Sequence, residues 1–184
     1  MLGFLITQRG IEVDTSKIRA ILELPPPRTE KEVRGFLGKV QFIRRFISKL
    51  TLTCEPLFGL LKKGKKFQWD SRCQAAFEQI NQYLQNPPVL SLPEPGKPLI
   101  LYLSVTETTM SCMRAEESED KVERAIYYQS KKMQDYETRY TPLEKACLAL
   151  VWATRKLRHY LLAHSKILVL RILVSRLDPI KYLF

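Results

Sequence analysis

The chain has 184 residues, of which 45% are hydrophobic and 27% are charged, so it can bury a core and is not disordered throughout. Its 30 basic and 19 acidic side chains give a net charge of +11, which favours a polyanionic partner such as nucleic acid. No apolar run is long enough to span a bilayer, so no membrane partner is expected. The four cysteines are widely spaced, which argues against a disulfide framework and favours an intracellular location, in the cytoplasm or the nucleus.

A proline-rich stretch divides the sequence. Residues 87–98 contain five prolines and one glycine, a composition that can neither continue a helix nor form a central strand. We therefore predict a first segment at 1–86, a linker at 87–98 and a second segment at 99–184.

The first segment is predicted to be a β-hairpin followed by helices. Residues 2–7 and 11–13 flank a turn that ends at Gly10, and Asp14 is placed to cap a short helix. Thr29 with Glu32 three residues later predicts the start of a longer helix. Leu57, Leu60 and Leu61, and a helix after Asp70, complete the predicted helical cluster.

The helix after Thr29 has two different faces. Apolar side chains at helical spacing predict a core-facing side made by Val33, Phe36, Leu37, Val40, Ile43 and Ile47. The opposite side combines cations, an amide and an aromatic ring around one glycine, which would let a ligand approach the backbone closely. We predict that this side faces the minor groove of a nucleic-acid duplex, and its members are Arg34, Gly38, Gln41, Phe42 and Arg45.

The second segment is predicted to be an α+β domain. Residues 99–105, 110–114 and 125–130 read as strands, the acidic stretch 116–123 as a loop, and 166–174 as a further apolar strand. A capping box at Thr141 and Glu144 opens a long helix that crosses the sheet. Its predicted inward side chains are Leu143, Ala146, Cys147, Leu150, Val151, Leu157 and Leu161.

Residue runs in both segments resemble one protein family. The first segment contains Gly10-Ile11-Glu12-Val13-Asp14, Arg34-Gly35-Phe36-Leu37-Gly38 and Phe67-Gln68-Trp69. The second contains Ile126-Tyr127-Tyr128, Leu148-Ala149-Leu150-Val151-Trp152-Ala153 and Asp178-Pro179-Ile180-Lys181-Tyr182-Leu183. With these runs, nearly the whole chain resembles the Pol polyprotein of gypsy-class long-terminal-repeat retrotransposons, and the final run is most similar to the plant branch.

This resemblance implies that the first segment is the end of a reverse transcriptase, with a primer-grip hairpin and then thumb and connecting helices. Leu2 and Gly3 correspond to the primer-grip turn, and Arg34, Gly38 and Phe42 to the thumb track along the minor groove of the template and primer. No Tyr-x-Asp-Asp motif or other pair of aspartates occurs. The chain is therefore not expected to polymerise DNA by itself.

The resemblance also implies a degenerate, truncated ribonuclease H-like domain at 99–184. In the intact family a cluster of carboxylates holds Mg²⁺, and the corresponding positions here are Ser104, Ala146 and Arg176. A hydroxyl, a methyl group and a cation do not bind a hard metal ion, so we expect no cofactor in this chain. The remaining candidates, Glu144 and Asp178, are better explained as helix-capping residues. The sheet of a truncated domain is also expected to leave one edge unpaired.

The sequence thus predicts a reverse transcriptase and ribonuclease H polyprotein fragment that is inactive alone and at most binds an RNA/DNA hybrid or DNA duplex, beside the rest of the Pol polyprotein. Two alternatives remain open. One is a domesticated protein-interaction module that recruits a partner strand through the exposed sheet edge. The other is a hybrid nuclease with an unconventional site.

Overall fold

The computed structural model describes residues 4–62, 66–94, 96–118, 120–163 and 167–174. Its N-terminal hairpin consists of β1 (Phe4–Thr7) and β2 (Gly10–Val13), paired antiparallel with Thr7 opposite Gly10. Asp14 then caps α1 (Thr15–Leu22), because its carboxylate accepts the backbone N–H of Ser16 at 2.8 Å. The hairpin and the first helix are therefore confirmed. Leu2 and Gly3, the predicted primer-grip turn, lie outside the described residues.

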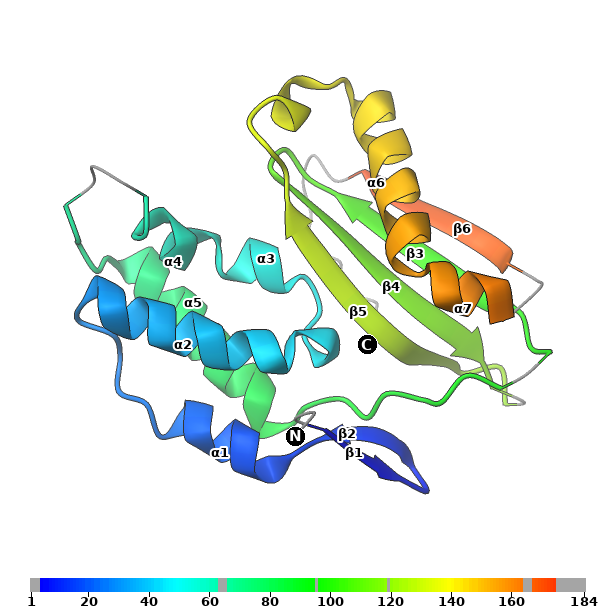
Figure 1. Ribbon diagram of the computed structural model, residues 1–184, viewed down its shortest axis with the longest axis horizontal. Coiled ribbons are helices and arrows are strands. Elements are labelled where there is room, and N and C mark those ends of the chain that lie inside the picture. Colours follow the sequence, from blue (N-terminus) through cyan, green and yellow to red (C-terminus); the bar gives the residue numbers. More distant parts are fainter. Residues whose placement is uncertain (1–3, 63–65, 95, 119, 164–166, 175–184) are drawn as a thin grey trace.

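Four helices and a short 3₁₀ turn, η1, form a cluster after the hairpin (Figure 1). Thr29 caps α2 as predicted, and Asp70 caps α5 by accepting the N–H of Cys73. The two long helices pack face to face, with the rings of Phe36 and Phe77 5.0 Å apart. These elements are α2 (Glu30–Phe42), η1 (Arg44–Phe46), α3 (Leu50–Thr53), α4 (Glu55–Gly59) and α5 (Ser71–Gln85).

A four-stranded mixed sheet follows, in the order β5-β4-β3-β6. Strands β3 (Leu99–Val105), β4 (Thr109–Glu117) and β5 (Glu123–Lys132) are antiparallel neighbours, and β6 (Ile167–Val174) runs parallel to β3. The 3₁₀ turn η2 (Glu137–Arg139) leads to α6 (Pro142–Lys156) and α7 (Arg158–Ala163). Helix α6 crosses one face of the sheet (Figure 1), which confirms the predicted α+β fold.

The loop between β4 and β5 is shorter than the sequence predicted. Residues 116–123 were expected to form an acidic loop, but β4 continues to Glu117 and β5 begins at Glu123. Glu116 is buried in the extended strand, where its carboxylate accepts the backbone N–H of Glu94 at 3.0 Å. This hydrogen bond compensates for burying a charged group, which the local sequence pattern does not reveal.

The face of α6 that packs on the sheet also differs from the prediction. Leu143, Cys147 and Val151 are exposed, and Leu143 keeps 75% of its accessible surface. Ala146 and Leu157 are buried as predicted, but the other buried apolar side chains are Ala149 and Ala153, which the sequence analysis did not place inward. Alanine side chains are small, so they let the helix backbone lie close to the strands. The face of α6 that packs on the sheet is therefore the one that allows this close approach, and not the one with the largest apolar side chains.

The helical part and the sheet share one core. Tyr128 of β5 is buried in the same cluster as Phe36 and Phe77, and Leu90 joins it from the predicted linker. Helix α3 and η1 pack along β5, so this edge of the sheet is covered by helices. The boundaries at 86 and 98 stay a prediction, but residues on both sides of them pack together. No described helix is long and apolar enough to cross a membrane.

Candidate nucleic-acid interface

The outer face of α2 gathers four of the predicted binding residues. Arg34, Gly38, Gln41 and Phe42 are all exposed, while Val33, Phe36 and Val40 of the opposite face are buried against α5. Phe42 keeps 72% of its accessible surface at the C-terminal end of the helix. The four residues therefore form one outward surface, which we call the α2 face.

Arg34 is available to an external anion. Among the described residues its ion-pair partner is Glu30, one turn earlier, with 3.9 Å between the Arg34 Nη2 and Glu30 Oε2 atoms. Both side chains are about half exposed or more, so this ion pair contributes little and is screened by salt. The guanidinium can exchange it for a phosphate, which it can bind through two N–H groups.

Gly38 is not required by packing inside the protein. A Cβ atom built on Gly38 would meet no heavy atom within 4 Å, and the same holds for Gly35. Glycine in a helix interior costs about 1 kcal/mol relative to alanine. The helix backbone is therefore open on the outside of α2 at this position, and the role of Gly38 in binding stays a prediction.

Arg45 does not belong to the α2 face. The sequence predicted one helix through Ile47, but α2 ends at Phe42 and the chain turns through η1. The Arg45 guanidinium lies between two aromatic rings, 4.8 Å from the centroid of Phe4 and 5.2 Å from that of Tyr127. These cation–π contacts join the hairpin to the sheet. Arg45 thus acts in the structure as a link between elements.

The ribonuclease H positions carry no metal-binding groups where they are described. Ser104 lies in β3, opposite Ser111 of β4, and Ala146 is buried in α6; Arg176 is outside the described residues. Among the described residues, no three acidic, histidine or cysteine side chains form a group that could hold a metal ion. A serine hydroxyl and an alanine methyl group do not fit the hard oxygen-ligand set that Mg²⁺ requires.

The neighbours of Ala146 in the sequence have structural roles. The carboxylate of Glu144 accepts the backbone N–H of Thr141 at 2.8 Å, which completes the predicted capping box and lowers the pKa of Glu144. Lys145 is buried, and its Nζ atom lies 3.0 Å from the carboxylate of Glu107 in the β3–β4 turn. Asp178, the other capping candidate, lies outside the described residues.

A basic groove lies beside the α2 face and was missed by the sequence analysis. It has a volume of about 700 Å³ and runs between the helical cluster, β5 and α6. Gln41 is one of its lining residues, so it continues from the α2 face. Its cations come from four separate elements of the fold, which no local motif brings together. We call it the basic groove, and its cations are Arg44, Lys62, Lys131, Lys132 and Lys156.

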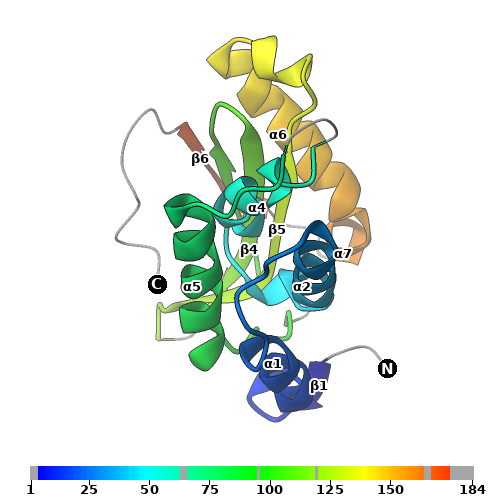
Figure 2. The same cartoon turned by 90° about the vertical axis from the view of Figure 1, so that its left-hand side faces the viewer.

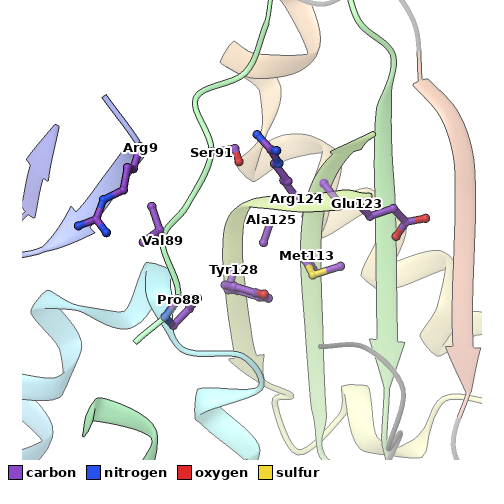
Figure 3. Close-up of a pocket in the computed structure, with 10 residues that line it drawn as sticks. Arg9, Pro88, Val89, Ser91, Met113, Glu123, Arg124, Ala125 and Tyr128 are labelled. Atoms are coloured by element: carbon purple, nitrogen blue, oxygen red, sulfur yellow. The ribbon is translucent and has the colours of Figure 1, made fainter. Parts of the chain in front are cut away.

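A second cavity, of about 500 Å³, lies between the hairpin, the proline-rich stretch and the sheet (Figure 3). Arg9 from the β1–β2 turn and Val89 from the proline-rich stretch face Met113 and Tyr128 of the sheet across it. Glu123 at its rim accepts a hydrogen bond from the Tyr102 hydroxyl. The predicted site residues that are described lie elsewhere, on α2, η1, β3 and α6.

Comparison with known proteins gives the family to which this fold belongs. The family described as "RNase H-like domain found in reverse transcriptase" matches residues 69–169, more than half of the chain. The chain therefore belongs to this family. The match begins at Trp69, so it includes α5 and the proline-rich stretch as well as the predicted second segment.

Particular relatives are retrotransposon polyproteins. The chain is 31% identical over 165 residues to the "Retrovirus-related Pol polyprotein from transposon 297" of Drosophila melanogaster, covering 89% of this chain and 15% of the relative. It is 30% identical over 160 residues to the "Transposon Tf2-3 polyprotein" of Schizosaccharomyces pombe, covering 87% of this chain and 12% of the relative. The chain thus spans less than a sixth of the length of these relatives. The predicted relationship to a Pol polyprotein is confirmed.

Solved structures agree with the sequence relatives. The foamy viral protease-reverse transcriptase in complex with RNA/DNA hybrid superposes with a TM-score of 0.73 at 25% identity, covering 97% of this chain and 24% of that chain. The foamy viral protease-reverse transcriptase in complex with dsDNA gives a TM-score of 0.72 at 25% identity, covering 97% of this chain and 36% of that chain. Nearly all of this chain therefore has a fold that is also found within the foamy viral protease-reverse transcriptase.

Proposed function

We propose that this chain is a duplex-binding part of a gypsy-class, plant-type Pol polyprotein, and that it binds an RNA/DNA hybrid or DNA duplex through the α2 face. The observation that carries the proposal is Gly38, which lies inside α2 at a position where a Cβ atom would meet no heavy atom within 4 Å. Arg34 and Phe42 flank this gap with a cation and an exposed aromatic ring. The related foamy viral proteins were solved with RNA/DNA hybrid and with dsDNA, which supports the same class of partner.

The chemistry of the α2 face suits the minor groove of a duplex. Arg34 supplies a charge for the phosphate backbone, and Gln41 supplies donors and acceptors for sugars or base edges. Phe42 adds apolar contact of the kind that minor-groove proteins use. None of these groups reads a long base sequence, so the binding should depend on duplex shape and salt more than on sequence.

We further propose that the chain does not cleave the hybrid that it binds. Hydrolysis of a phosphodiester by this fold needs carboxylates that position divalent ions, and Ser104 and Ala146 cannot supply them. The bound strand would then remain intact. Cleavage of a hybrid by the purified chain in Mg²⁺, abolished by a chelator, would show an unconventional nuclease site and contradict this part of the proposal.

A titration of a labelled RNA/DNA hybrid, followed by fluorescence anisotropy at about 50 mM and about 200 mM salt, tests the binding. We expect binding at the lower salt concentration that weakens at the higher one. Arg34→Gln should weaken binding several-fold and reduce the salt slope by about 0.9, the value for one lost phosphate contact. An absence of binding at low salt would refute the proposal.

The variant Gly38→Leu distinguishes an effect on hybrid binding from an effect on folding. A Cβ atom at this exposed position meets no heavy atom within 4 Å, and leucine favours the helix, so we expect the variant to be at least as stable as the wild type. It should nevertheless weaken hybrid binding, because it fills the gap that the duplex enters. Gly59→Leu in α4 is the matched control, since a Cβ there also meets nothing within 4 Å. Equal affinities for these two variants would rule out close approach at Gly38.

A further inference from the structure

The basic groove gathers five cations, and the described part of the protein pairs one of them with a carboxylate. Lys131 is paired with Glu137, whose carboxylate lies 2.8 Å from the lysine Nζ atom. Burial disfavours the charged form of Glu137, but the hydrogen bonds from Lys131 and from the Gln134 N–H outweigh it, and the pKa of Glu137 is lowered. Within the described part of the chain, the other four cations of the groove form no ion pair.

The position of these unpaired cations is not explained by folding. Arg44 precedes α3, Lys62 follows α4, Lys132 ends β5 and Lys156 ends α6, so they are far apart in the sequence. Bringing like charges to one groove costs repulsion unless an anion occupies it. An elongated polyanion can contact all four elements at once, whereas a single small anion cannot.

The size and walls of the groove indicate one strand of nucleic acid. About 700 Å³ is the volume of a site for a ligand of a few rings, which accommodates a short stretch of one strand and not both strands of a duplex. Trp152 of α6 and Phe58 of α4 line the groove among the cations. Aromatic side chains within a basic groove are typical of single-strand binding, because any base can stack on them.

We infer that the basic groove binds a short unpaired segment of the same nucleic acid whose duplex lies on the α2 face. This rests on the proposed function. Gln41 belongs to both surfaces, so a strand that leaves the duplex at the end of α2 enters the groove directly. Figure 2 places α2 and α6 on the same side of the molecule, so the two surfaces can be occupied together.

The test compares two hybrids with the same duplex, one blunt and one with an overhang of six thymidines, using the full chain. The overhang should increase affinity several-fold at low salt. The double variant Lys132→Gln/Lys156→Gln should remove most of this increase and leave the affinity for the blunt hybrid unchanged. It should also reduce the salt slope for the overhang hybrid by about 0.7 for each cation that contacts a phosphate.

Arg155→Gln is the matched control, because Arg155 is an exposed cation of the same helix that does not line the groove. A second readout is the fluorescence of Trp152 in a Trp69→Phe background, where it is the remaining tryptophan. Oligothymidylate should quench it, as expected for base stacking.

The outcomes separate the two proposals. If the blunt hybrid fails to bind, the function proposed for the α2 face is wrong. If the blunt hybrid binds but the overhang does not increase the affinity, the groove inference is wrong and the proposal for the α2 face stands. The same conclusion follows if the overhang increases the affinity of the double variant as much as that of the wild type. Unchanged Trp152 fluorescence at saturating oligothymidylate would also overturn the groove inference.

Discussion

The hydroxyl of Ser130 in β5 caps the N-terminus of α3 through Thr51. The Ser130 Oγ atom accepts the Thr51 backbone N–H at 2.9 Å and lies 2.8 Å from the Thr51 hydroxyl. The residue before α3, Lys49, provides no side-chain cap and has a left-handed backbone with φ of 50°. A residue of the sheet therefore satisfies a helix donor that the helix's own sequence leaves free.

Ser130→Ala should destabilise the protein by about 1 kcal/mol, because it leaves a partly buried N–H without its acceptor. Urea unfolding followed by circular dichroism measures this change. Thr51→Val keeps the backbone N–H and removes only the hydroxyl, so it should cost less. The double variant should cost less than the sum of the two single variants. Additive effects would show that the two side chains do not interact.

Gly10, at the start of β2, lies where the hairpin contacts the proline-rich stretch. Its φ of +133° is accessible mainly to glycine, and a Cβ there would overlap the carbonyl oxygen of Leu90. Next to it, Ile11 and Leu90 exchange two backbone hydrogen bonds, of 2.7 and 2.9 Å. Gly10→Ala should cost at least about 1 to 3 kcal/mol from backbone strain alone.

The free energy of unfolding of Gly10→Ala, measured in urea, checks this expectation. Gly59→Ala is the control, because Gly59 has open space around its missing Cβ. That control should change the stability by less than about 1 kcal/mol. Similar values for the two variants would mean that the hairpin can move away from Leu90 at little cost.

Local signals in the sequence predicted the fold well. Asp14, Thr29, Asp70 and Thr141 each cap the helix that the sequence assigned to them, because capping depends on neighbouring residues alone. The strand at 99–105 is also confirmed with its predicted bounds. The exposure of Arg34, Gly38, Gln41 and Phe42 follows from the helical period of their opposite face.

Features that depend on distant residues could not be predicted in this way. Arg45 leaves the α2 face, and its guanidinium contacts the rings of Phe4 and Tyr127, which are far apart in the sequence. The basic groove is formed by cations from separate elements, of which only Lys131 and Lys132 are adjacent in the sequence. Such arrangements come from tertiary packing, which residue spacing does not encode.

The face of α6 that packs on the sheet differs from the predicted one, and two substitutions test this difference. Ala149 and Ala153 are fully buried against the sheet, whereas Leu143 is mostly exposed. Ala149→Leu should therefore cost about 1 to 3 kcal/mol through overpacking, while Leu143→Gln should change the stability by less than about 0.5 kcal/mol. Urea unfolding of both variants checks this. A large loss for Leu143→Gln would favour the face that the sequence predicted.

Asp70 should make the stability depend on acid pH. Its pKa is lowered from 3.8 to about 2, first because its carboxylate accepts the backbone N–H of Cys73 at the start of α5, and also because Arg72 lies 3.0 Å away. A carboxyl with a lower pKa in the folded state stabilises the fold fully above its unfolded pKa. This stabilisation should decrease as the pH falls from 3.8 towards about 2.

Asp70→Asn isolates this effect, because asparagine caps a helix about as well as aspartate but carries no charge. Thermal unfolding at several pH values should give a higher Tm for the wild type above pH 3.8 and a difference that shrinks towards about pH 2. Arg72→Gln should keep most of the pH dependence, since the backbone N–H of Cys73 is the larger cause. A difference in Tm between wild type and Asp70→Asn that does not change with pH would show that the cap does not act through its charge.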